Sequence, residues 1–570
     1  MELDLIIKNV QVYNAYFKKF IDADVAILKG RFLYIGKEHS QELSAKEVID
    51  GKGKYMIPGL IDIHMHIESS MTTPFQFSQA VIQHGVTTVV ADPHEIANVF
   101  GVEGITAMVN STKQNAVDIF YGIPSSVPST SSKLETTGGS INPEDVSKLL
   151  EIDQVCCLGE VMNFKDLIND DDAPINQIIR EIKRDRPHMQ IEGHCPKITG
   201  LDLAKYIYQG VDADHTQQSA ATLKEKIQNG MFIEIQQKSM TAENIAYLIE
   251  NNLYEHFCLV TDDVMADKLV EGHLNTLVKK AIAMGMTPEM AIYVSTYTPA
   301  KRMLMHDRGS IAPGKKADFI LLTDIEDFII ASVYKNGEEV FAGEINYQEK
   351  EKEFPEHFYK SVHLDLVSEI DFEVNTPMHC EEVDCRIMEV KPSTTFTEEK
   401  KSTLAVKMGK LQWEASPYCL IVVFDRYGKS KNKSFGLVTG SIIKEGAVAT
   451  TYAHDHHNLM VMGQNARDMT VAANWIIKNQ GGYCVVKDGE ILSALSLPVG
   501  GILSEERIDV LGKKLKNIRA DLQKLGYEHH NEIMSFSTLS LPVSPSLKIT
   551  DKGLIDVRSQ EIVHLFYEEK

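Results

Sequence analysis

The sequence predicts an α/β protein built on a (β/α)₈ TIM-type barrel, flanked by a small β-sandwich and followed by a C-terminal α+β domain. Residues 57–304 alternate apolar strand-like runs with amphipathic stretches, over a length that suits such a barrel. Short strand-like runs separated by turn residues occur on both sides of that segment. A charged run then begins at Gln348, and a chain of 570 residues has room for a further domain.

The predicted β-sandwich comes from two separate parts of the chain, residues 1–56 and 305–347. Its strand-like runs are Leu5–Val12, Asp24–Gly36, Ala317–Leu322 and Ser332–Val340. The dipeptide Asn336-Gly337 lies between two such runs and is typical of a type I′ hairpin turn. We therefore expect one small β domain assembled from both sides of the barrel segment.

Eight strands are predicted within the barrel segment, 57–304. They are Leu60–His66, Thr87–Asp92, Asp118–Ile123, Val155–Val161, Met189–His194, Val211–His215, Met231–Ile235 and Phe257–Thr261. Most of these runs end in a polar or titratable residue. Because barrel active sites form at the C-terminal ends of the strands, function is expected there. Residues 348–570 mix strands and helices without a recognisable period and are expected to form the α+β domain.

Composition and charge exclude several classes of function. The formal net charge of −22 repels phosphate backbones and anionic lipid, and the short lysine runs at 400–401 and 429–433 are more typical of solvated faces than of nucleic-acid sites. The first residues lack a basic region followed by an apolar one, and no apolar run reaches the 18 residues of a spanning helix. We expect a cytoplasmic protein with neither nucleic acid nor membrane as partner.

Ligand-type residues follow the predicted strands at several places. His64 and His66 are two residues apart on a strand, so both imidazoles project from one face. Glu160, His194, His215 and Asp262 end the fourth, fifth, sixth and eighth predicted strands. Imidazoles with carboxylates suit Zn²⁺, Mn²⁺ or Fe²⁺, and a bridging carboxylate lets two ions share a water. A lone pair of histidines is weak evidence for a metal site, but the whole set of residues predicts a metal centre.

Two further groups of ligand-type residues have a less definite role. Asp92 and His94 end the second predicted strand, where they would orient substrate, bind a further cation or form a hydrogen-bond network around the metal ligands. His454, His456 and His457 precede an apolar run in the C-terminal part. A histidine-rich loop is more often a solvated or subunit-contacting surface than a metal site. Our hypothesis is that this loop covers the barrel mouth and gives one histidine to substrate or to an additional cation. The alternative is that the domain only buries apolar barrel surface or forms the dimer.

Several motifs resemble a known family. The run Pro58–His66, with the flanking β unit, resembles the amidohydrolase superfamily. A closer resemblance, to the bacterial adenine deaminase family, rests on Ile67–Met71, Ala91–Val99, Gly193–Pro196, Leu259–Asp263, Ala453–Leu459 and Ser496–Gly501. The resemblance implies hydrolysis of adenine to hypoxanthine and ammonia in purine salvage. It also implies a centre of one or two divalent ions, Mn²⁺ or Fe²⁺ with Zn²⁺ as an alternative, and a homodimer or higher homo-oligomer.

The resemblance also implies roles for individual residues. His64, His66, His194 and His215 are expected metal ligands, together with Asp262 and Glu160. Glu160 stands where many binuclear amidohydrolases carry a carboxylated lysine and is interpreted as the bridging ligand. Asp262 is the expected proton shuttle for water attacking C6. Asp263 is expected to contact the purine at N7, which requires the strand to end there because successive strand residues point oppositely.

One departure from the related adenosine deaminases concerns the proton donor to N1. A glutamate follows the fifth-strand histidine in those enzymes, whereas Cys195-Pro196-Lys197 follows it here. Glu68, Glu95 and Glu234 are the alternative donors, unranked. Two other functions remain open, namely hydrolysis of a cyclic amide, as in dihydroorotase and hydantoinase relatives, and an inactive scaffold. The complete His, Glu and Asp set argues against the scaffold, and the long C-terminal part argues against the cyclic amidohydrolase.

Overall fold

The computed structural model describes residues 2–112, 115–344, 347–348, 350, 352–376 and 380–567. It divides into two compact units. The barrel unit comprises Met1–Pro93, Met108–Ser125 and Asn142–Glu349, and the C-terminal unit comprises His94–Ala107, Ser126–Ile141 and Lys350–Lys570. Within the charged run predicted as a boundary, Glu349 and Glu351 lie outside the described residues.

Eight parallel strands form the barrel. They are β6 (Leu60–Met65), β7 (Val86–Ala91), β8 (Asp118–Ile123), β9 (Val155–Val161), β10 (Gln190–Gly193), β11 (Ala213–Asp214), β12 (Phe232–Ile235) and β13 (Phe257–Leu259). Ladders join them in the orders β10-β9-β8-β7-β6 and β11-β12-β13. A parallel bridge between Met65 and Asp262 brings the end of β6 to the residues after β13. The predicted TIM-type barrel is thus present.

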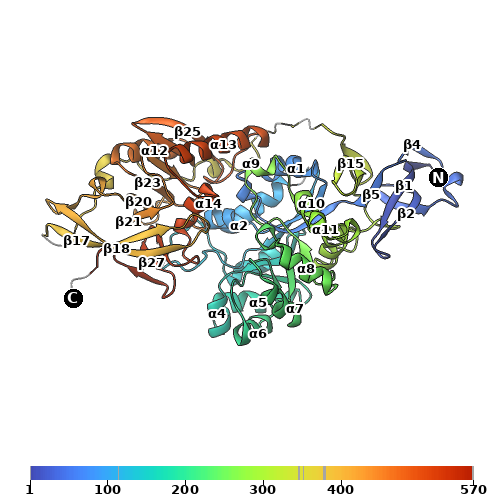
Figure 1. The fold of residues 1–570 in the computed structure, drawn as a ribbon, viewed down its shortest axis with the longest axis horizontal. Helices are drawn as coiled ribbons and strands as arrows, with labels where there is room; N and C mark the ends of the chain where they lie inside the picture. Colours follow the sequence, from blue (N-terminus) through green and yellow to red (C-terminus); the bar gives the residue numbers. More distant parts are fainter. Residues whose placement is uncertain are drawn as a thin grey trace. The chain divides into compact units, whose positions relative to one another are not determined.

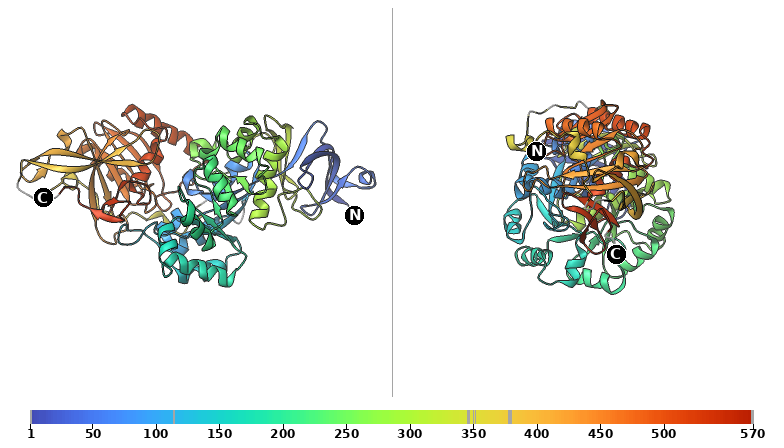
Figure 2. Two further views of the ribbon diagram at one scale, coloured as in Figure 1. Left: turned by 60° about the horizontal axis from the view of Figure 1, so that its bottom comes forward. Right: turned by 90° about the vertical axis from the view of Figure 1, so that its left-hand side faces the viewer.

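Helices follow the strands and cover the outside of the barrel (Figures 1 and 2). In the barrel unit they are α1 (Pro74–Ile82), α3 (Pro143–Leu150), α4 (Phe164–Asn169), α5 (Pro174–Asp185), α6 (Gly200–Tyr208), α7 (Ala220–Gln228), α8 (Ala242–Glu250), α9 (Ala266–Leu269), α10 (Leu274–Ala283) and α11 (Pro288–Arg302). Most of α2 (His94–Ser111), which also follows a barrel strand in the chain, belongs to the C-terminal unit. Helix α5 shows how the sequence specifies one. Pro174 occupies its first turn, and Ile175, Ile178, Ile179 and Ile182 repeat at helical spacing and are buried.

The two ends of β6 have different surroundings. Ile61 and Ile63 pack in one apolar cluster with residues of β7, β9 and β13 and with Ala300 and Met303, at the end of α11. His64, near the C-terminal end of the strand, stacks on the His215 ring with centroids 3.7 Å apart and lies 3.8 Å from Glu234 Oε2. The apolar part of β6 therefore anchors the strand, and its C-terminal end carries polar residues for the site.

The two flanks of the barrel segment build one eight-stranded sheet. Its strands are β1 (Leu3–Asn14), β2 (Lys19–Leu28), β3 (Arg31–Gly36), β4 (Ala45–Asp50), β5 (Tyr55–Pro58), β14 (Phe319–Asp324), β15 (Ile329–Lys335) and β16 (Glu338–Phe341). Strand β5 pairs with β14, so strands from both flanks belong to one sheet. Asn336 and Gly337 both have positive φ, at 50° and 80°, as a type I′ turn requires. The two-layer sandwich stays a prediction.

The C-terminal unit contains a nine-stranded sheet in the order β19-β18-β17-β21-β20-β23-β22-β24-β25. The strands are β17 (Glu382–Val390), β18 (Thr397–Lys407), β19 (Lys410–Leu411), β20 (Cys419–Phe424), β21 (Lys433–Gly440), β22 (Ala447–Thr450), β23 (Leu459–Gly463), β24 (Gly482–Lys487) and β25 (Glu490–Ser496). The remaining elements are α12 (Ala466–Lys478), α13 (Ile508–Lys524), α14 (Glu532–Ser537), β26 (Leu547–Thr550), β27 (Gly553–Asp556) and β28 (Glu561–Val563).

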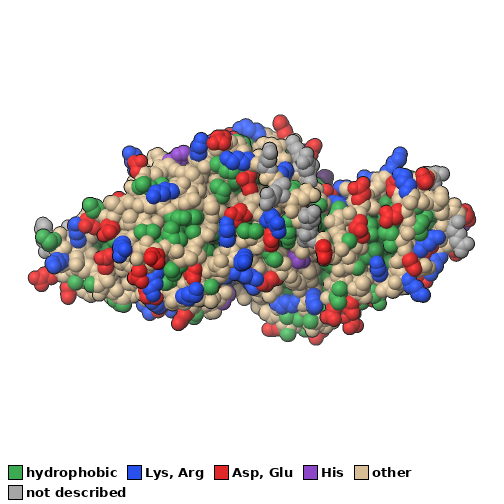
Figure 3. Space-filling view, turned by 90° about the horizontal axis from the view of Figure 1, so that it is seen from above, with side chains coloured by type: hydrophobic (Ala, Val, Ile, Leu, Met, Phe, Trp, Pro, Cys, Tyr) green, Lys and Arg blue, Asp and Glu red, His purple; other side chains and the backbone are tan. Residues whose placement is uncertain are grey.

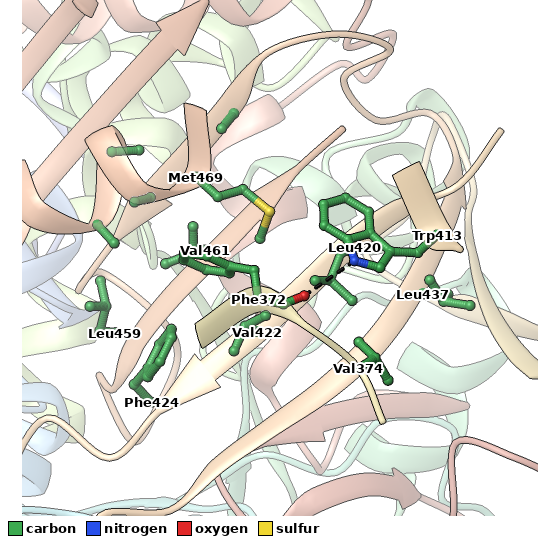
Figure 4. Close-up of a cluster of buried hydrophobic side chains, with 14 of the residues drawn as sticks. Phe372, Val374, Trp413, Leu420, Val422, Phe424, Leu437, Leu459, Val461 and Met469 are labelled. Carbon is green, nitrogen blue, oxygen red and sulfur yellow. Dashed lines mark hydrogen bonds between the residues drawn. The ribbon is translucent and has the colours of Figure 1, made fainter. Parts of the chain in front are cut away.

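A buried apolar cluster forms the core of this unit (Figure 4). Val422 and Val461 of the central strands pack there with Met469 of α12. Trp413 is buried in the same cluster, and its indole Nε1 donates a hydrogen bond to the carbonyl oxygen of Phe372 at 3.2 Å. The C-terminal part therefore has a core of its own, as an independent domain requires.

Two pieces of the predicted barrel segment belong to the C-terminal unit, His94–Ala107 and Ser126–Ile141. Hydrogen bonds within that unit explain the grouping. Gly139 N donates to the carbonyl of Asn98 at 2.9 Å, and the backbone and hydroxyl of Thr136 both donate to the Asp551 carboxylate. The sequence analysis did not predict this exchange, because a contact between distant segments leaves no local pattern.

Acidic and basic side chains are interspersed on the face that Figure 3 shows. In the part of the chain that the structure describes, no helix combines the length and apolar character that crossing a membrane requires.

Candidate active site

His64 and His66 lie at the C-terminal end of β6, and both are buried. Asp62 holds this strand in place. Its Oδ2 accepts a hydrogen bond from the Thr261 hydroxyl at 2.6 Å, and its Oδ1 accepts one from the backbone N–H of His64 at 3.3 Å. Asp62 therefore ties β6 to the segment after β13, where Asp262 lies.

Glu160, near the end of β9, lies at the centre of the predicted ligand set. Its Oε2 is 2.7 Å from His194 Nδ1 and 3.2 Å from His215 Nε2, and its Oε1 is 3.5 Å from His66 Nε2. Ligand-type atoms of Glu160, His64 and His66 lie within 4.8 Å of one another, and so do those of Glu160, His194 and His215. The Glu160 carboxylate is thus shared by two pairs of imidazoles, His64 with His66 and His194 with His215.

Asp262 completes the set from the opposite side. Its Oδ1 lies 3.5 Å from His66 Nε2 and 4.0 Å from His64 Nε2, and its Oδ2 accepts a hydrogen bond from Gln236 Nε2 at 2.7 Å. Strand β13 ends at Leu259, and Asp262 has a left-handed φ of 58°. The condition for Asp262 and Asp263 to face the same site is therefore met, because the strand does not continue through them.

The histidine nitrogens are oriented for metal binding. Nδ1 of His66 donates to the backbone carbonyl of Asp92 at 3.1 Å, which leaves Nε2 toward Glu160 and Asp262. Nε2 of His64 is buried and has no hydrogen-bond partner among the residues that the structure describes. Four imidazoles and two carboxylates with these orientations fit a divalent transition metal.

The charges of the two carboxylates also suit cations. Burial alone would raise the pKa of the Glu160 carboxyl, but His215 and His194 hold it well below its ordinary value. Burial opposes ionisation of Asp262 in the same way, and the hydrogen bond from His66 and the charge of Lys238 keep its pKa low. Both groups are therefore ionised at neutral pH and available as anionic ligands.

The ends of β10 and β11, which carry His194 and His215, are held by a buried ion pair that sequence reasoning missed. Asp214 Oδ2 lies 2.7 Å from Lys226 Nζ, on α7, and both side chains are at most 2% exposed. Asp214 Oδ1 also accepts the backbone N–H of Cys195 at 2.8 Å. The sequence shows an acidic residue, Asp214, directly before His215. It does not show that the partner of this residue, Lys226, lies on the following helix.

A second missed feature supports Glu160. The Asp92 carboxylate accepts the backbone N–H of Glu160 at 2.9 Å. Residue 159 must be glycine, because a Cβ there would lie 2.2 Å from Asp92 Oδ2. Asp92 thus supports the site both through this contact and through its own carbonyl, which orients His66.

The structure places the other predicted residues as follows. Glu68 is buried in the short helix η2 (Glu68–Ser70), and the neighbouring Ser69 hydroxyl donates to Asp263 Oδ1 at 2.5 Å. Glu234 Oε2 lies 3.8 Å from His64 Nδ1. His94 and Glu95 belong to the C-terminal unit, where Glu95 contacts His454 and His457.

The histidine loop of the C-terminal unit corrects one expectation. A solvated surface was considered more typical for His454, His456 and His457, but all three are buried, with relative exposures of 4%, 0% and 0%. His456 Nδ1 accepts a hydrogen bond from the backbone N–H of Asn458 at 3.0 Å. The solvated-surface interpretation is wrong, because composition reflects average exposure, whereas buried partners from other segments, such as Glu95, decide this case. That the loop covers the barrel mouth stays a prediction.

Comparisons with known proteins agree with this architecture. Residues 55–340 match the Amidohydrolase family, and residues 394–561 match the Adenine deaminase C-terminal domain. The chain is 61% identical to an adenine deaminase from Clostridium perfringens, over 99% of this chain and 100% of that protein. It is 52% identical to adenine deaminase 2 from Shouchella clausii, over 100% of both chains.

Among solved structures, one similar fold is a beta-aspartyl dipeptidase from Fervidobacterium islandicum AW-1. That structure covers 62% of this chain and 100% of its own, with 19% sequence identity and a TM-score of 0.47.

Proposed function

The chain belongs to the adenine deaminase family of the amidohydrolases, and we propose that its barrel centre performs the family's reaction. The enzyme hydrolyses adenine to hypoxanthine and ammonia. The observation that carries the proposal is the convergence of four histidines with Glu160 and Asp262 at the C-terminal ends of the barrel strands. A role in purine salvage follows from the substrate and the product.

We propose His64, His66, His194 and His215 as metal ligands, together with Glu160 and Asp262. The sharing of Glu160 between two imidazole groups supports a centre of two ions bridged by that carboxylate. The donor set suits Mn²⁺ or Fe²⁺, with Zn²⁺ as the alternative. When bound, such cations supply Lewis-acid activation of the attacking water at neutral pH.

Asp262 is the proposed proton shuttle. The hydrogen bond from Gln236 fixes its carboxylate, and the low pKa keeps it ionised and able to accept a proton. As the water oxygen bonds to C6, Asp262 takes a proton from that water. It then returns the proton to the exocyclic amine while the C6–N bond breaks and ammonia leaves. The second water proton leaves the oxygen as the C6=O bond of hypoxanthine forms and restores the group that protonated N1.

Ser69 and Asp263 form a hydrogen-bonded pair suited to reading the purine edge, with Asp263 contacting N7. For protonation of N1 we favour Glu68, which is buried in the barrel unit beside this pair. Glu95 is engaged with His454 and His457 in the C-terminal unit, which makes it a weaker choice.

The test measures ultraviolet loss of adenine together with ammonia release by the full-length, metal-loaded chain. Adenine is expected to be consumed with one ammonia per base, while dihydroorotate and hydantoin stay intact. Ring opening of either cyclic amide at a comparable rate, or no release from adenine by a chain with full metal content, would contradict the proposal. The homo-oligomer and the cytoplasmic location stay predictions; light scattering after gel filtration tests the former.

A further inference from the structure

The C-terminal unit contains a second buried group of metal-ligand side chains. Glu95 lies in the first turn of α2, and His454, Asp455 and His457 lie on the loop between β22 and β23. All belong to the same compact unit. Their side chains are between 0% and 5% exposed, so water cannot solvate their charges.

The ligand-type atoms converge on the Glu95 carboxylate. His454 Nδ1 lies 2.6 Å from Glu95 Oε1, and His457 Nε2 contacts Glu95 Oε2. Asp455 Oδ1 is 3.4 Å from His454 Nδ1, and His94 Nε2 is 3.7 Å from Glu95 Oε1. Two ligands on one tetrahedral ion, with bonds of about 2.0–2.1 Å, lie about 3.3–3.5 Å apart. The separation of Asp455 and His454 has this value. The contacts of Glu95 with His454 and His457 are shorter, at hydrogen-bond distance, and would lengthen around a bound ion.

Asp455 supplies an independent indication of a cation. Its carboxylate is 3% exposed, and Oδ2 has no hydrogen-bond partner among the residues that the structure describes. The buried guanidinium of Arg426 directs its N–H groups elsewhere, to oxygens of Ser361, His457, Gly500 and Tyr427. Two buried carboxylates beside imidazoles are stabilised when a divalent ion neutralises them.

The loop is held in shape by contacts other than these ligand atoms. Asn458 Nδ2 donates to the Thr136 carbonyl at 2.8 Å, and Asn458 Oδ1 accepts the backbone N–H of Arg426 at 3.1 Å. The Tyr427 hydroxyl donates to the His456 carbonyl at 2.7 Å, and the Ser540 hydroxyl donates to the His454 carbonyl at 3.0 Å. The side chains at 454, 455 and 457 are thus preorganised and available for binding.

We propose that Glu95, His454, Asp455 and His457 bind one divalent transition-metal ion, at a site whose ligands are all different from those of the barrel centre. The imidazole and carboxylate donors suit Zn²⁺, Mn²⁺ or Fe²⁺. The ion joins the segment His94–Ala107, which directly follows the barrel residue Pro93 in the chain, to the β22–β23 loop of the C-terminal sheet. Its role is to fasten that segment within the C-terminal unit.

The test uses the full-length chain, stripped of metal and reloaded with Zn²⁺ alone. Crystals of this protein should show an anomalous difference peak at the zinc edge among Glu95, His454 and His457. Elemental analysis after desalting should find about one zinc per chain fewer in Glu95→Gln and in His457→Asn. Glu160→Gln, which affects the barrel centre, should keep the C-terminal zinc.

The matched control is His456→Asn. His456 is buried on the same loop, but its Nδ1 is used by the Asn458 N–H, and an asparagine oxygen can accept the same bond. This variant should hold as much zinc as the unaltered chain. No anomalous peak at Glu95 in the unaltered protein would overturn the proposal, even if the variants failed to fold. An unchanged zinc count in both Glu95→Gln and His457→Asn would do the same.

Discussion

Replacing Lys226 by methionine tests whether the buried ion pair with Asp214 holds the two metal-ligand strands in place. The Nζ–Oδ2 distance is 2.7 Å, and the side chains are 2% and 0% exposed. Methionine keeps most of the apolar stem and removes the charge. Asp214 would retain its hydrogen bonds from Cys195 and Thr216 but lose its counter-ion.

The expected cost can be worked out in two ways. Burial raises the pKa of Asp214, but the charge of Lys226 dominates and brings it from 3.8 to about 2, which corresponds to about 2 kcal/mol of stability at neutral pH. Removing one partner of a buried pair costs about 3–5 kcal/mol in other proteins, because the remaining charge is left uncompensated. The remaining hydrogen bonds to Asp214 place our expectation at the lower end, about 3 kcal/mol.

The pH dependence has a definite sign. In the unaltered chain the folded pKa of Asp214 is depressed, so its contribution is present above about pH 4 and is lost as pH falls toward 2. In Lys226→Met, burial without the lysine should raise that pKa above the unfolded value. Asp214 then stabilises the fold when protonated and loses that contribution as pH rises. The stability difference between the two proteins should therefore grow from pH 4 to pH 7.

Hydrogen exchange measured by mass spectrometry gives a local readout, because the Cys195 amide donates to Asp214. A cost of about 3 kcal/mol corresponds to roughly 100-fold faster exchange in the peptide that contains Cys195. Metal content should fall as well, by the roughly 10–100-fold loss of affinity typical for residues that orient ligands. The control is Lys205→Met on α6, whose pair with Asp202 is 3.8 Å long and solvent-exposed, and whose expected cost is under about 1 kcal/mol.

Equal exchange rates at Cys195 in Lys226→Met and Lys205→Met would refute the reasoning. A stability difference that shrinks between pH 4 and pH 7 would refute the assigned sign.

Further predictions concern the barrel centre. Prolonged chelation should abolish adenine turnover, and Mn²⁺ or Fe²⁺ should restore it; full activity in a chain shown to be metal-free would contradict the metal centre. Asp262→Asn should lower kcat by roughly 10²–10⁴-fold at unchanged stability, whereas Glu160→Gln should first lower metal content; a parental rate in Asp262→Asn excludes the shuttle role. Gly159→Ala should lower the free energy of unfolding by about 1–3 kcal/mol and displace the Asp92 carboxylate. An unfolding temperature and a metal content equal to those of the unaltered chain would contradict this prediction. Adenine should be strongly preferred over adenosine, because a pocket that closes near N9 would clash with the ribose; similar kcat/KM values for the two would contradict this prediction.

Local patterns predicted much of the barrel. The observed bounds of β8 and β9 equal the predicted ones, because a continuous apolar run bounded by turn residues specifies a buried strand. The strands β11 and β13 are shorter than predicted. The last predicted residues, His215 in one strand and Val260 and Thr261 in the other, lie outside the observed strands, and the backbone turns just after Thr261, at Asp262 with its left-handed φ. The hydrophobic pattern of the sequence does not show where such a strand ends.

The candidate site was predictable where a residue's own chemistry carries the signal. Histidines and carboxylates at strand ends are visible in the sequence, so the structure could bring together a set already named. Lys226 and Gly159 were not visible in this way, because a lysine on a helix and a glycine in a strand acquire meaning only from their neighbours, Asp214 and Asp92. Residues that hold the ligands in place are therefore harder to predict than the ligands themselves.

The histidine loop shows how far this limit extends. Its composition suggests a hydrated surface, yet His456, His457 and Asn458 are fully buried. They are buried because His94–Ala107 and Ser126–Ile141, which interrupt the barrel segment, belong to the C-terminal unit and supply Glu95 and the Thr136 carbonyl as partners. Burying this many imidazoles and carboxylates is costly unless each charge is compensated. A bound cation would compensate these charges. It would also fasten the segment His94–Ala107, which begins shortly after strand β7, within the C-terminal unit.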